Sequence, residues 1–280
     1  MDDFIGIFDI HAHASPDPAG RRSIDVFELA KLYLDAGFRG FLIMGHFDPT
    51  AGLAYLVKKA TPELEVYGGI VLNTLIGGIN LHAVRHFAGM DGGLGKIVYM
   101  PTVDCENEVR KSGSSGPCVR VSKDGRLLPE VLDMLDLIAD LGLALSTGHN
   151  SSAEILMLIE AARERGINRI LVTNPQYPAI SMSTEDMKRA AEMGAYLEFI
   201  YYCVGMHGTK LTMRDYTDAI RAIGPERCIL SSCGGQSWMP IHTFAWRELL
   251  AGMRGGGIED SEIDVMCKRN PARLLSLDES

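Results

Sequence analysis

The stretch Ile5-Gly-Ile-Phe-Asp-Ile-His-Ala-His13 lies near the start of the chain and is apolar apart from three polar side chains. A short apolar run that ends in polar residues is typical of a parallel strand covered by helices. Because side chains alternate along a strand, Asp9, His11 and His13 should share one face, with the apolar residues between them on the other. The apolar face suits packing against helices, so we expect the three polar side chains to point toward the centre of the fold.

Seven more runs of this kind follow, and segments with helix signals separate them. The predicted strands are Ile5–His13, Gly40–His46, Glu65–Asn73, Lys96–Asp104, Ala144–His149, Arg169–Asn174, Ala195–Tyr202 and Cys228–Cys233. Capping residues and punctuating Gly or Pro mark predicted helices at 25–36, 129–142, 151–166, 183–194 and 212–224. Eight strand–helix units close most simply into a (β/α)₈ TIM barrel, so we predict the α/β class with a single domain over residues 1–280. A doubly wound open sheet is the alternative, but no Gly-x-Gly-x-x-Gly follows the first strand.

One connection is longer than the others. Residues 105–128, after the fourth predicted strand, are rich in Gly, Ser and charged side chains. Within them, the residues around Lys123-Asp-Gly125 are suited to a small hairpin. Long loops at the carboxyl end of a barrel more often cover a site than link domains, so we expect this insertion to act as a lid.

Composition excludes several classes of protein. The 280 residues carry 27 Lys and Arg against 36 Asp and Glu, a formal net charge of −9, which argues against a nucleic-acid partner. No apolar run reaches the roughly 18 residues that cross a bilayer, and the acidic start is unlike a secretory signal. Six irregularly spaced cysteines indicate neither a disulfide framework nor a cysteine zinc knot. We expect a cytoplasmic protein that binds a small molecule, without a membrane partner; scattered Met and aromatic residues would permit a homo-oligomer.

The two histidines of the first strand are the strongest chemical signal. In a (β/α)₈ barrel the active site lies at the carboxyl ends of the strands. Neutral imidazole binds zinc-like ions, so His11 and His13 could form half of a metal site, with Asp9 as a hydrogen-bond partner beside them. The alternative is two polar histidines whose nitrogens are satisfied by neighbouring groups.

At this point the sequence resembles the amidohydrolase superfamily, the metal-dependent hydrolases built on a (β/α)₈ barrel. Phe8-Asp-Ile-His-Ala-His13 is similar to the first-strand signature of that superfamily, and Met266-Cys-Lys-Arg-Asn-Pro-Ala-Arg-Leu-Leu275 resembles its closing segment. The match is closest to members without an appended β-sandwich. The resemblance implies a divalent metal, with zinc first and Mn or Fe as alternatives. It also implies that His149, at the end of the fifth predicted strand, is a metal ligand.

Two positions depart from the pattern that the resemblance implies. Asn174 stands where a histidine is usual, and its amide oxygen is a poorer zinc ligand. Cys233 stands where an aspartate is usual, and a thiolate is a strong, soft ligand but not a carboxylate base. Three outcomes remain open: Cys233 completes a site with His11, His13 and His149; Glu198, inside an apolar strand, supplies a ligand or a base; or the metal is lost and a binding pocket remains.

Other polar residues at strand ends complete the candidate site. His46 and Asp104 are candidates for proton transfer. Three amide side chains could orient a substrate: Asn73, Asn174 and Gln236. His82 and His86 are four residues apart on a predicted outer helix, where solvent-exposed histidines are the better interpretation.

The expected activity is hydrolysis of a carbon–nitrogen (amide or cyclic amide) or ester bond of a small molecule by metal-activated water. A phosphate substrate is disfavoured, because the strand ends show neither an arginine cluster nor a glycine-rich cradle. One alternative is a metal-dependent decarboxylase of the same superfamily. Another is a non-catalytic barrel that binds a small molecule in a degenerate site.

Overall fold

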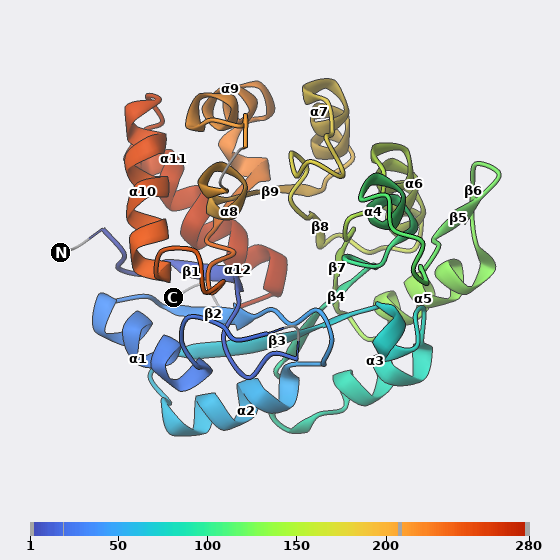
Figure 1. The fold of residues 1–280 in the computed structure, drawn as a ribbon, viewed down its shortest axis with the longest axis horizontal. Helices are drawn as coiled ribbons and strands as arrows, with labels where there is room; N and C mark the ends of the chain where they lie inside the picture. The colour runs from blue at the N-terminus through green and yellow to red at the C-terminus, as the bar shows by residue number, and fades with distance from the viewer. Residues whose placement is uncertain (1–2, 19, 207–208, 278–280) are drawn as a thin grey trace.

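Eight parallel strands form one sheet in the order β1-β2-β3-β4-β7-β8-β9-β10, with helices between them (Figure 1). The computed structural model describes residues 3–18, 20–206 and 209–277. The strands are β1 Phe8–Ala12, β2 Gly40–Ile43, β3 Glu65–Val71, β4 Gly95–Tyr99, β7 Ala144–Ser146, β8 Ile170–Val172, β9 Tyr196–Ile200 and β10 Cys228–Ser231. Each corresponds to one predicted strand, and the predicted (β/α)₈ barrel is confirmed. Most of the polar residues predicted at strand ends, among them His46, Asn73, His149 and Cys233, lie just beyond the observed strands, where the following loops begin.

Helices alternate with the strands as predicted. They are α1 Val26–Ala36, α2 Ala51–Ala60, α3 Leu81–Ala88, α4 Glu106–Lys111, α5 Pro129–Asp140, α6 Ser152–Glu164, α7 Thr184–Glu192, α8 Tyr201–Gly205, α9 Met213–Ile223, α10 His242–Gly255, α11 Asp260–Asp264 and α12 Asn270–Leu275. Short turns of helix lie at Thr74–Ile76, Asp91–Gly93, Pro225–Arg227 and Val265–Arg269. The capping signals are borne out: Ser151 and Glu154 form a complete capping box at the start of α6.

The barrel closes where the last strand meets the first. The backbone N–H of Cys233 donates to His11 O at 2.8 Å, and that of His13 donates to Gly234 O at 3.0 Å. These two hydrogen bonds lie beyond the end of β10, so the residues that close the barrel are also the candidate site residues.

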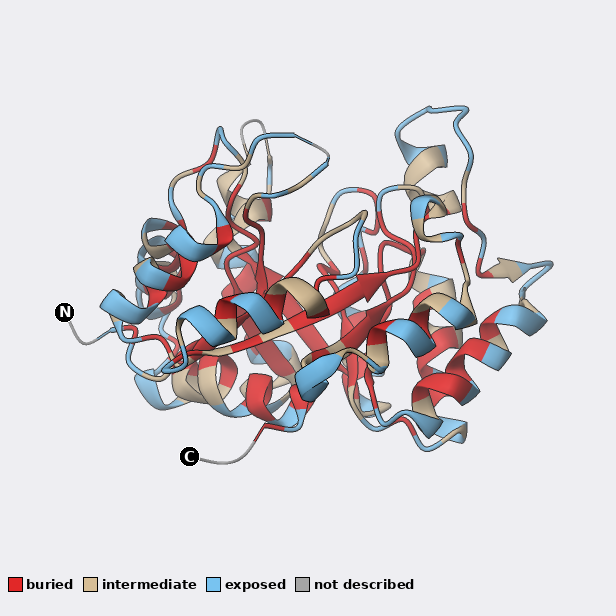
Figure 2. Cartoon of the chain, turned by 90° about the horizontal axis from the view of Figure 1, so that it is seen from below, coloured by how far each residue is buried: buried red, intermediate tan, exposed pale blue. Residues whose placement is uncertain are grey.

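Two apolar layers hold the barrel together, and burial is concentrated in the strands (Figure 2). The larger layer lies between the strands and the outer helices. The smaller one takes at least one side chain from every strand of the barrel and is covered at one end by Leu274 and Leu275 of α12. The interior of the barrel is therefore a packed core rather than a pore.

The prediction for the faces of the first strand was wrong for Asp9, which was expected to point inward, and for Phe8 and Ile10, which were expected to pack against helices. Phe8 and Ile10 belong to the interior layer, whereas Asp9 faces the outer helices. The register with β2 shifts between Asp9 and Ala12, which is a β-bulge. A bulge inserts one residue and breaks the alternation of faces, so His11 can point inward although Asp9 points outward.

Asp9 is the centre of a buried network. Its Oδ2 accepts hydrogen bonds from Tyr33 OH at 2.6 Å, Ser232 Oγ at 2.5 Å and Trp246 Nε1 at 2.9 Å. Its Oδ1 accepts from the backbone N–H groups of His11 and Ser232. A carboxylate with this many donors is satisfied without a counter-ion, and it ties β1 and the end of β10 to α1 and α10.

The insertion after β4 has structure of its own. It contains α4 and the predicted hairpin, made of β5 Ser122–Lys123 and β6 Arg126–Leu127, which projects beside α5 and α6 (Figure 1). Asn107 of α4 donates to the carbonyl oxygens of His149 and Ala179, both at 2.9 Å. The insertion is thereby fastened to the loops after β7 and β8.

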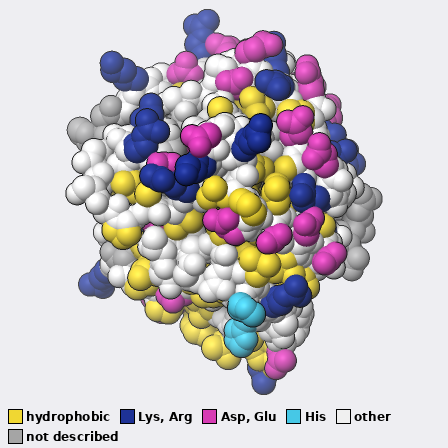
Figure 3. Space-filling view, turned by 90° about the vertical axis from the view of Figure 1, so that its right-hand side faces the viewer, with side chains coloured by type: hydrophobic (Ala, Val, Ile, Leu, Met, Phe, Trp, Pro, Cys, Tyr) yellow, Lys and Arg dark blue, Asp and Glu magenta, His cyan; other side chains and the backbone are white. Residues whose placement is uncertain are grey.

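Lys and Arg alternate with Asp and Glu over the face drawn in Figure 3, with no basic stripe on that face. Within the described chain, no helix combines the length and the apolar character needed to span a bilayer.

Candidate active site

A cavity of about 180 Å³ lies at the carboxyl ends of the strands. Its wall takes side chains from the ends or following loops of every barrel strand except β3. Seven of the predicted site residues line it directly: His11, His13, His46, His149, Asn174, Cys233 and Gln236. No Asp or Glu lines it among the residues that the structure describes.

His11, His13 and Cys233 form the one group of candidate metal ligands found among the described residues. All three are buried, and one ligand atom from each lies within 4.8 Å of the others. His11 Nε2 and His13 Nδ1 are buried and have no hydrogen-bond partner. Two orphaned imidazole nitrogens beside a thiol fit a divalent ion, because burying such atoms without a partner is unfavourable.

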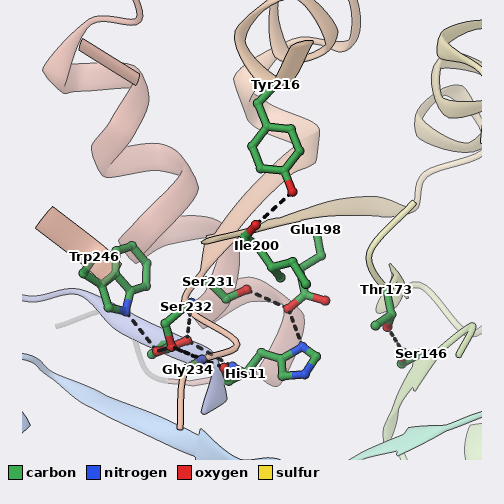
Figure 4. Close-up of polar contacts among 11 residues, drawn as sticks. His11, Ser146, Thr173, Glu198, Ile200, Tyr216, Ser231, Ser232, Gly234 and Trp246 are labelled. Carbon is green, nitrogen blue, oxygen red and sulfur yellow. Dashed lines mark hydrogen bonds and ion pairs between the residues drawn. The ribbon is translucent and has the colours of Figure 1, made fainter. Parts of the chain in front are cut away.

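Glu198 positions His11 from behind the cavity. Its Oε1 lies 3.1 Å from His11 Nδ1 and accepts a second hydrogen bond from Ser231 Oγ at 2.6 Å (Figure 4). With Nδ1 held in this way, the Nε2 of the ring is directed to the cavity. A carboxylate behind a histidine fixes the tautomer and the orientation that a metal ligand needs.

The surroundings of His11 favour a cation. Burial lowers the pKa of His11, but the negative charges of Cys233 and Glu198 outweigh it and hold the pKa well above its ordinary value. Surroundings that retain a proton on an imidazole are also favourable for a metal ion at the same place.

His13 is held as a neutral ring. Burial lowers its pKa well below the ordinary value, and His11 and His46 lower it further. The ring of His46 stacks on it, with centroids 5.2 Å apart. A neutral imidazole is the form that donates a lone pair to a metal.

His46 also lines the cavity, between His13 and His149. Its Nδ1 lies 2.9 Å from Thr102 Oγ1. Burial lowers its pKa well below the ordinary value, and the neighbouring His149 and His11 add to that effect. It is therefore neutral near pH 7, and as a neutral ring it can donate or accept a hydrogen bond.

Besides Glu198, which lies behind His11, two predicted site residues lie outside the cavity wall. Asn73 accepts from the backbone N–H of Thr102 at 2.8 Å and donates to His46 O at 3.0 Å, so it braces the loops after β2 and β4. Asp104 accepts from the backbone N–H of Thr74 at 2.8 Å and from the hydroxyl of the same residue. In the structure both residues support the loops, and neither lines the cavity.

His149 lines the cavity but is not in the three-residue group. Its Nδ1 lies 3.4 Å from Glu108 Oε2, and its ring packs on Tyr177 with centroids 5.0 Å apart. The hydroxyl of Tyr177 donates to the other oxygen of Glu108 at 3.1 Å.

Asn174 and Gln236 each bring an unused oxygen to the cavity. Asn174 Oδ1 and Gln236 Oε1 are buried without a hydrogen-bond partner. Asn174 has a left-handed φ of 47°, which turns the chain sharply after β8. A bound molecule could satisfy these amides.

Sequence reasoning missed several residues of the site. Arg22 lines the cavity, and its Nε and Nη2 contact Asp17 Oδ2 at 2.8 and 2.6 Å. Tyr177 and Tyr202 line it as well, and burial raises the pKa of both, so they keep their hydroxyl protons. Only their position in the sequence could have indicated a role in the site. They follow β1, β8 and β9, and the loops after barrel strands are where function is usually found.

A family model described as "Family of unknown function (DUF6282)" matches residues 6–198. The sequence has no match among curated proteins.

Three solved structures share the fold over nearly the whole length of both chains. A probable 2-pyrone-4,6-dicarboxylic acid hydrolase from Acinetobacter baumannii with citric acid bound has a TM-score of 0.63 and 12% identity, covering 98% of this chain and 100% of the other. A 2,6-dihydroxybenzoate decarboxylase from Rhizobium has a TM-score of 0.61 and 11% sequence identity, and the match covers 99% of this chain and 100% of the other. An amidohydrolase from Burkholderia multivorans with bound zinc has a TM-score of 0.63 and 11% sequence identity, and the match covers 97% of this chain and 99% of the other. At these identities the likeness concerns the fold.

Proposed function

This chain belongs to DUF6282, a family of unknown function, and we propose that it is a metal-dependent enzyme acting on a small molecule inside the barrel. The observation that carries the proposal is the buried group of His11, His13 and Cys233, with two imidazole nitrogens that have no partner. The group lies at the carboxyl ends of the strands, where barrels of this kind carry their chemistry.

Zinc is the ion that this donor set suits best. Two imidazoles and one thiolate are soft and intermediate ligands, whereas Mn and Mg prefer carboxylates and water. Three protein ligands are typical of a catalytic zinc site, because a fourth position stays open for water or substrate. When bound, the ion would lower the pKa of water and polarise a carbonyl group.

The remaining residues of the wall suit a small acid. Arg22 brings a guanidinium whose planar fork pairs with carboxylates, and Asp17 engages it through a single oxygen. No carboxylate among the described residues of the wall would repel an anion. Asn174 and Gln236 would orient the polar groups of the bound molecule.

We infer that the reaction is hydrolysis of a carbon–nitrogen or ester bond. Glu198 keeps the His11 ring in place, and the neutral His46 is available to hydrogen-bond a carbonyl or hydroxyl of the substrate. Among proteins with the same fold, one is described as a hydrolase of a pyrone dicarboxylic acid, which is a cyclic ester.

Decarboxylation is the second candidate, and one observation favours it. Within the described chain, Glu198 contacts His11 and Ser231, Asp9 accepts hydrogen bonds from Tyr33 and Trp246, and neither carboxylate lines the cavity. The cavity wall thus lacks the carboxylate base usual for hydrolysis, while Arg22 could hold a substrate carboxylate. A decarboxylase shares the fold.

Metal content tests the proposal first. The purified full chain should bind one zinc ion, and His11→Ala should lose it. His82→Ala is the matched control, because His82 is exposed on α3 and should change nothing. A wild-type chain that takes up no divalent ion under any loading condition would overturn the proposal.

Product analysis then separates the two reactions. The zinc-loaded chain is incubated with lactones, cyclic amides and aromatic acids, and the formation of new carboxylate groups and of carbon dioxide is measured. Hydrolysis forms a new carboxylate without carbon dioxide, whereas decarboxylation releases carbon dioxide. Turnover that is equal in wild type and His11→Ala would contradict a metal-dependent reaction of either kind.

A further inference from the structure

The proposed function leaves the opposite wall of the cavity without a role. There, three elements meet that are far apart in the sequence: α4 of the insertion, the loop after β7 and the loop after β8. They bring together Glu108, His149 and Tyr177, none of which belongs to the metal group.

Two buried polar atoms face each other in this cluster. His149 Nδ1 and Glu108 Oε2 are 3.4 Å apart, and neither has a hydrogen-bond partner. The separation is within ion-pair range but lacks hydrogen-bond geometry. Catalytic hydrogen bonds are often long in the absence of substrate and tighten when the site is occupied.

The rest of the cluster holds this arrangement in place. The hydroxyl of Tyr177 donates to Glu108 Oε1 at 3.1 Å, and its ring packs on His149. Asn107, one residue before Glu108, donates to the carbonyl oxygen of His149 at 2.9 Å. The backbone and the ring of His149 are therefore both fixed by α4 and by the loop after β8.

The direction of the ring completes the argument. Because Nδ1 of His149 faces Glu108, the Nε2 on the other side of the ring is left for the cavity that His149 lines. A histidine with a carboxylate at one nitrogen and a reaction space at the other has the geometry of a general acid–base.

Resting on the proposed function, we propose that His149 is the proton-transfer residue of this site rather than a metal ligand, with Glu108 as its positioning residue. In hydrolysis, His149 Nε2 takes the proton that water releases on adding to the carbonyl carbon. It returns that proton to the departing nitrogen or oxygen as the bond to the carbonyl carbon breaks. His149 ends in its starting state, and the overall reaction consumes one water.

The insertion gains a function under this proposal. It supplies Glu108, so the acid–base pair exists only when α4 is docked on the barrel. The groups that face His149 are Glu108 from α4, Tyr177 from the loop after β8 and His46 from the loop after β2, whose ring centroid is 6.3 Å away.

The test uses the full chain, loaded with zinc and labelled with ¹⁵N in its histidines. The ring signals are followed by NMR as a function of pH, and the signal that disappears in His149→Gln identifies His149. We expect this ring to titrate in the zinc-loaded protein, and we expect His149→Gln to retain one zinc ion per chain. Glu108→Gln should shift the His149 midpoint downward, because a carboxylate 3.4 Å from Nδ1 favours the imidazolium and the amide does not.

Glu106→Gln is the matched control. Glu106 lies on the same helix but pairs with Arg120 at 3.0 Å, so its loss should leave the midpoint unchanged. Should Glu108→Gln not fold, Tyr177→Phe decides: it keeps the ring and removes only a donor to Glu108, so the midpoint should rise.

Two results would overturn the proposal. One is loss of zinc in His149→Gln together with a His149 ring that does not titrate, which would make it a ligand. The other is a midpoint that none of the variants moves. A wild-type chain without zinc would instead contradict the proposed function, and the effect of Glu108 could still be measured in that chain.

Discussion

His11 shows how a single side chain is prepared for a metal. Its Nδ1 is held by Glu198, its Nε2 is left without a partner, and Cys233 lies beside it. None of these contacts comes from a residue near it in the sequence. The ring is oriented by β9 and met by the turn after β10, so the barrel must be closed before the site exists.

Glu198→Gln should weaken zinc binding by about 10–100-fold while the chain stays folded. The amide keeps the size of the side chain but lacks the charge that fixes the His11 tautomer. Competition with a chelator measures the affinity, and Glu65→Gln, a strand glutamate paired with Arg39 away from the cavity, is the control. Equal affinity in Glu198→Gln and wild type would show that Glu198 does not position the ligand.

Asp9→Asn should destabilise the fold by about 2–4 kcal/mol. The new amide group would present a donor to hydroxyl and indole donors that now bond Asp9, and buried groups would lose their partners. Urea unfolding measures the effect. Asp35→Asn, which removes an exposed ion pair with Lys31, should change stability by less than about 1 kcal/mol. An unchanged unfolding midpoint in Asp9→Asn would contradict the role of the network.

At the scale of elements, the first strand depends on its bulge. The histidine pair could be recognised from the sequence because it ends a strand of apolar residues. The bulge between Asp9 and Ala12 could not, since no Gly or Pro marks it and strict alternation is the default. It separates one polar residue that stabilises the fold from two that line the site.

The turn that precedes His149 requires glycine at position 148. Gly148 has a φ of 63°, and a Cβ there would overlap the backbone of Met100 and Pro101. Gly148→Ala should therefore destabilise the protein by about 3 kcal/mol or more, since backbone must move as well as adopt a strained conformation.

Gly166→Ala is the matched comparison for that substitution. Gly166 has a similar φ of 78°, but nothing lies within 4 Å of its Cβ position, so only the left-handed strain of about 1–2 kcal/mol applies. Thermal or urea unfolding separates the two. Equal losses of stability would show that the contact with the loop after β4 is unimportant.

At the scale of the whole molecule, buried cysteine thiols determine how the stability of the fold changes at alkaline pH. Burial raises the pKa of Cys105 to about 12 and raises those of Cys203, Cys228 and Cys267 as well. In the unfolded chain these thiols ionise near pH 8.5. A group whose pKa is higher in the folded state contributes stability that is complete below its unfolded pKa and is lost as pH rises toward the folded one.

We therefore expect the urea midpoint to fall steadily between about pH 8.5 and 10. The comparison is made at constant ionic strength, with a reductant present so that thiols stay reduced. A midpoint that is flat or rising over this range would contradict the burial of the four thiols.

The sequence alone was enough for the barrel, because most strands are nearly continuous apolar runs and the helices predicted between them are marked by capping residues, Gly or Pro. It also placed His11, His13, His46, His149 and Cys233 at one face. Glu108 and Arg22 were not predictable as neighbours of these residues, because Glu108 lies on α4 of the insertion and Arg22 in the loop after β1, and the positions of both segments depend on packing between distant parts of the chain. Asn73 and Asp104 were predicted as substrate-orienting and proton-transfer residues; in the structure they accept hydrogen bonds from the backbone of neighbouring loops and do not line the cavity.

The central claim is that His11, His13 and Cys233 bind one ion, and X-ray absorption at the zinc K-edge of the loaded full chain tests it most directly. The account predicts one sulfur at about 2.3 Å and at least two imidazole nitrogens at about 2.0–2.1 Å, with the sulfur absent in Cys233→Ser. Zinc bound without any sulfur neighbour in the wild-type chain, or no zinc retained at all, would contradict it.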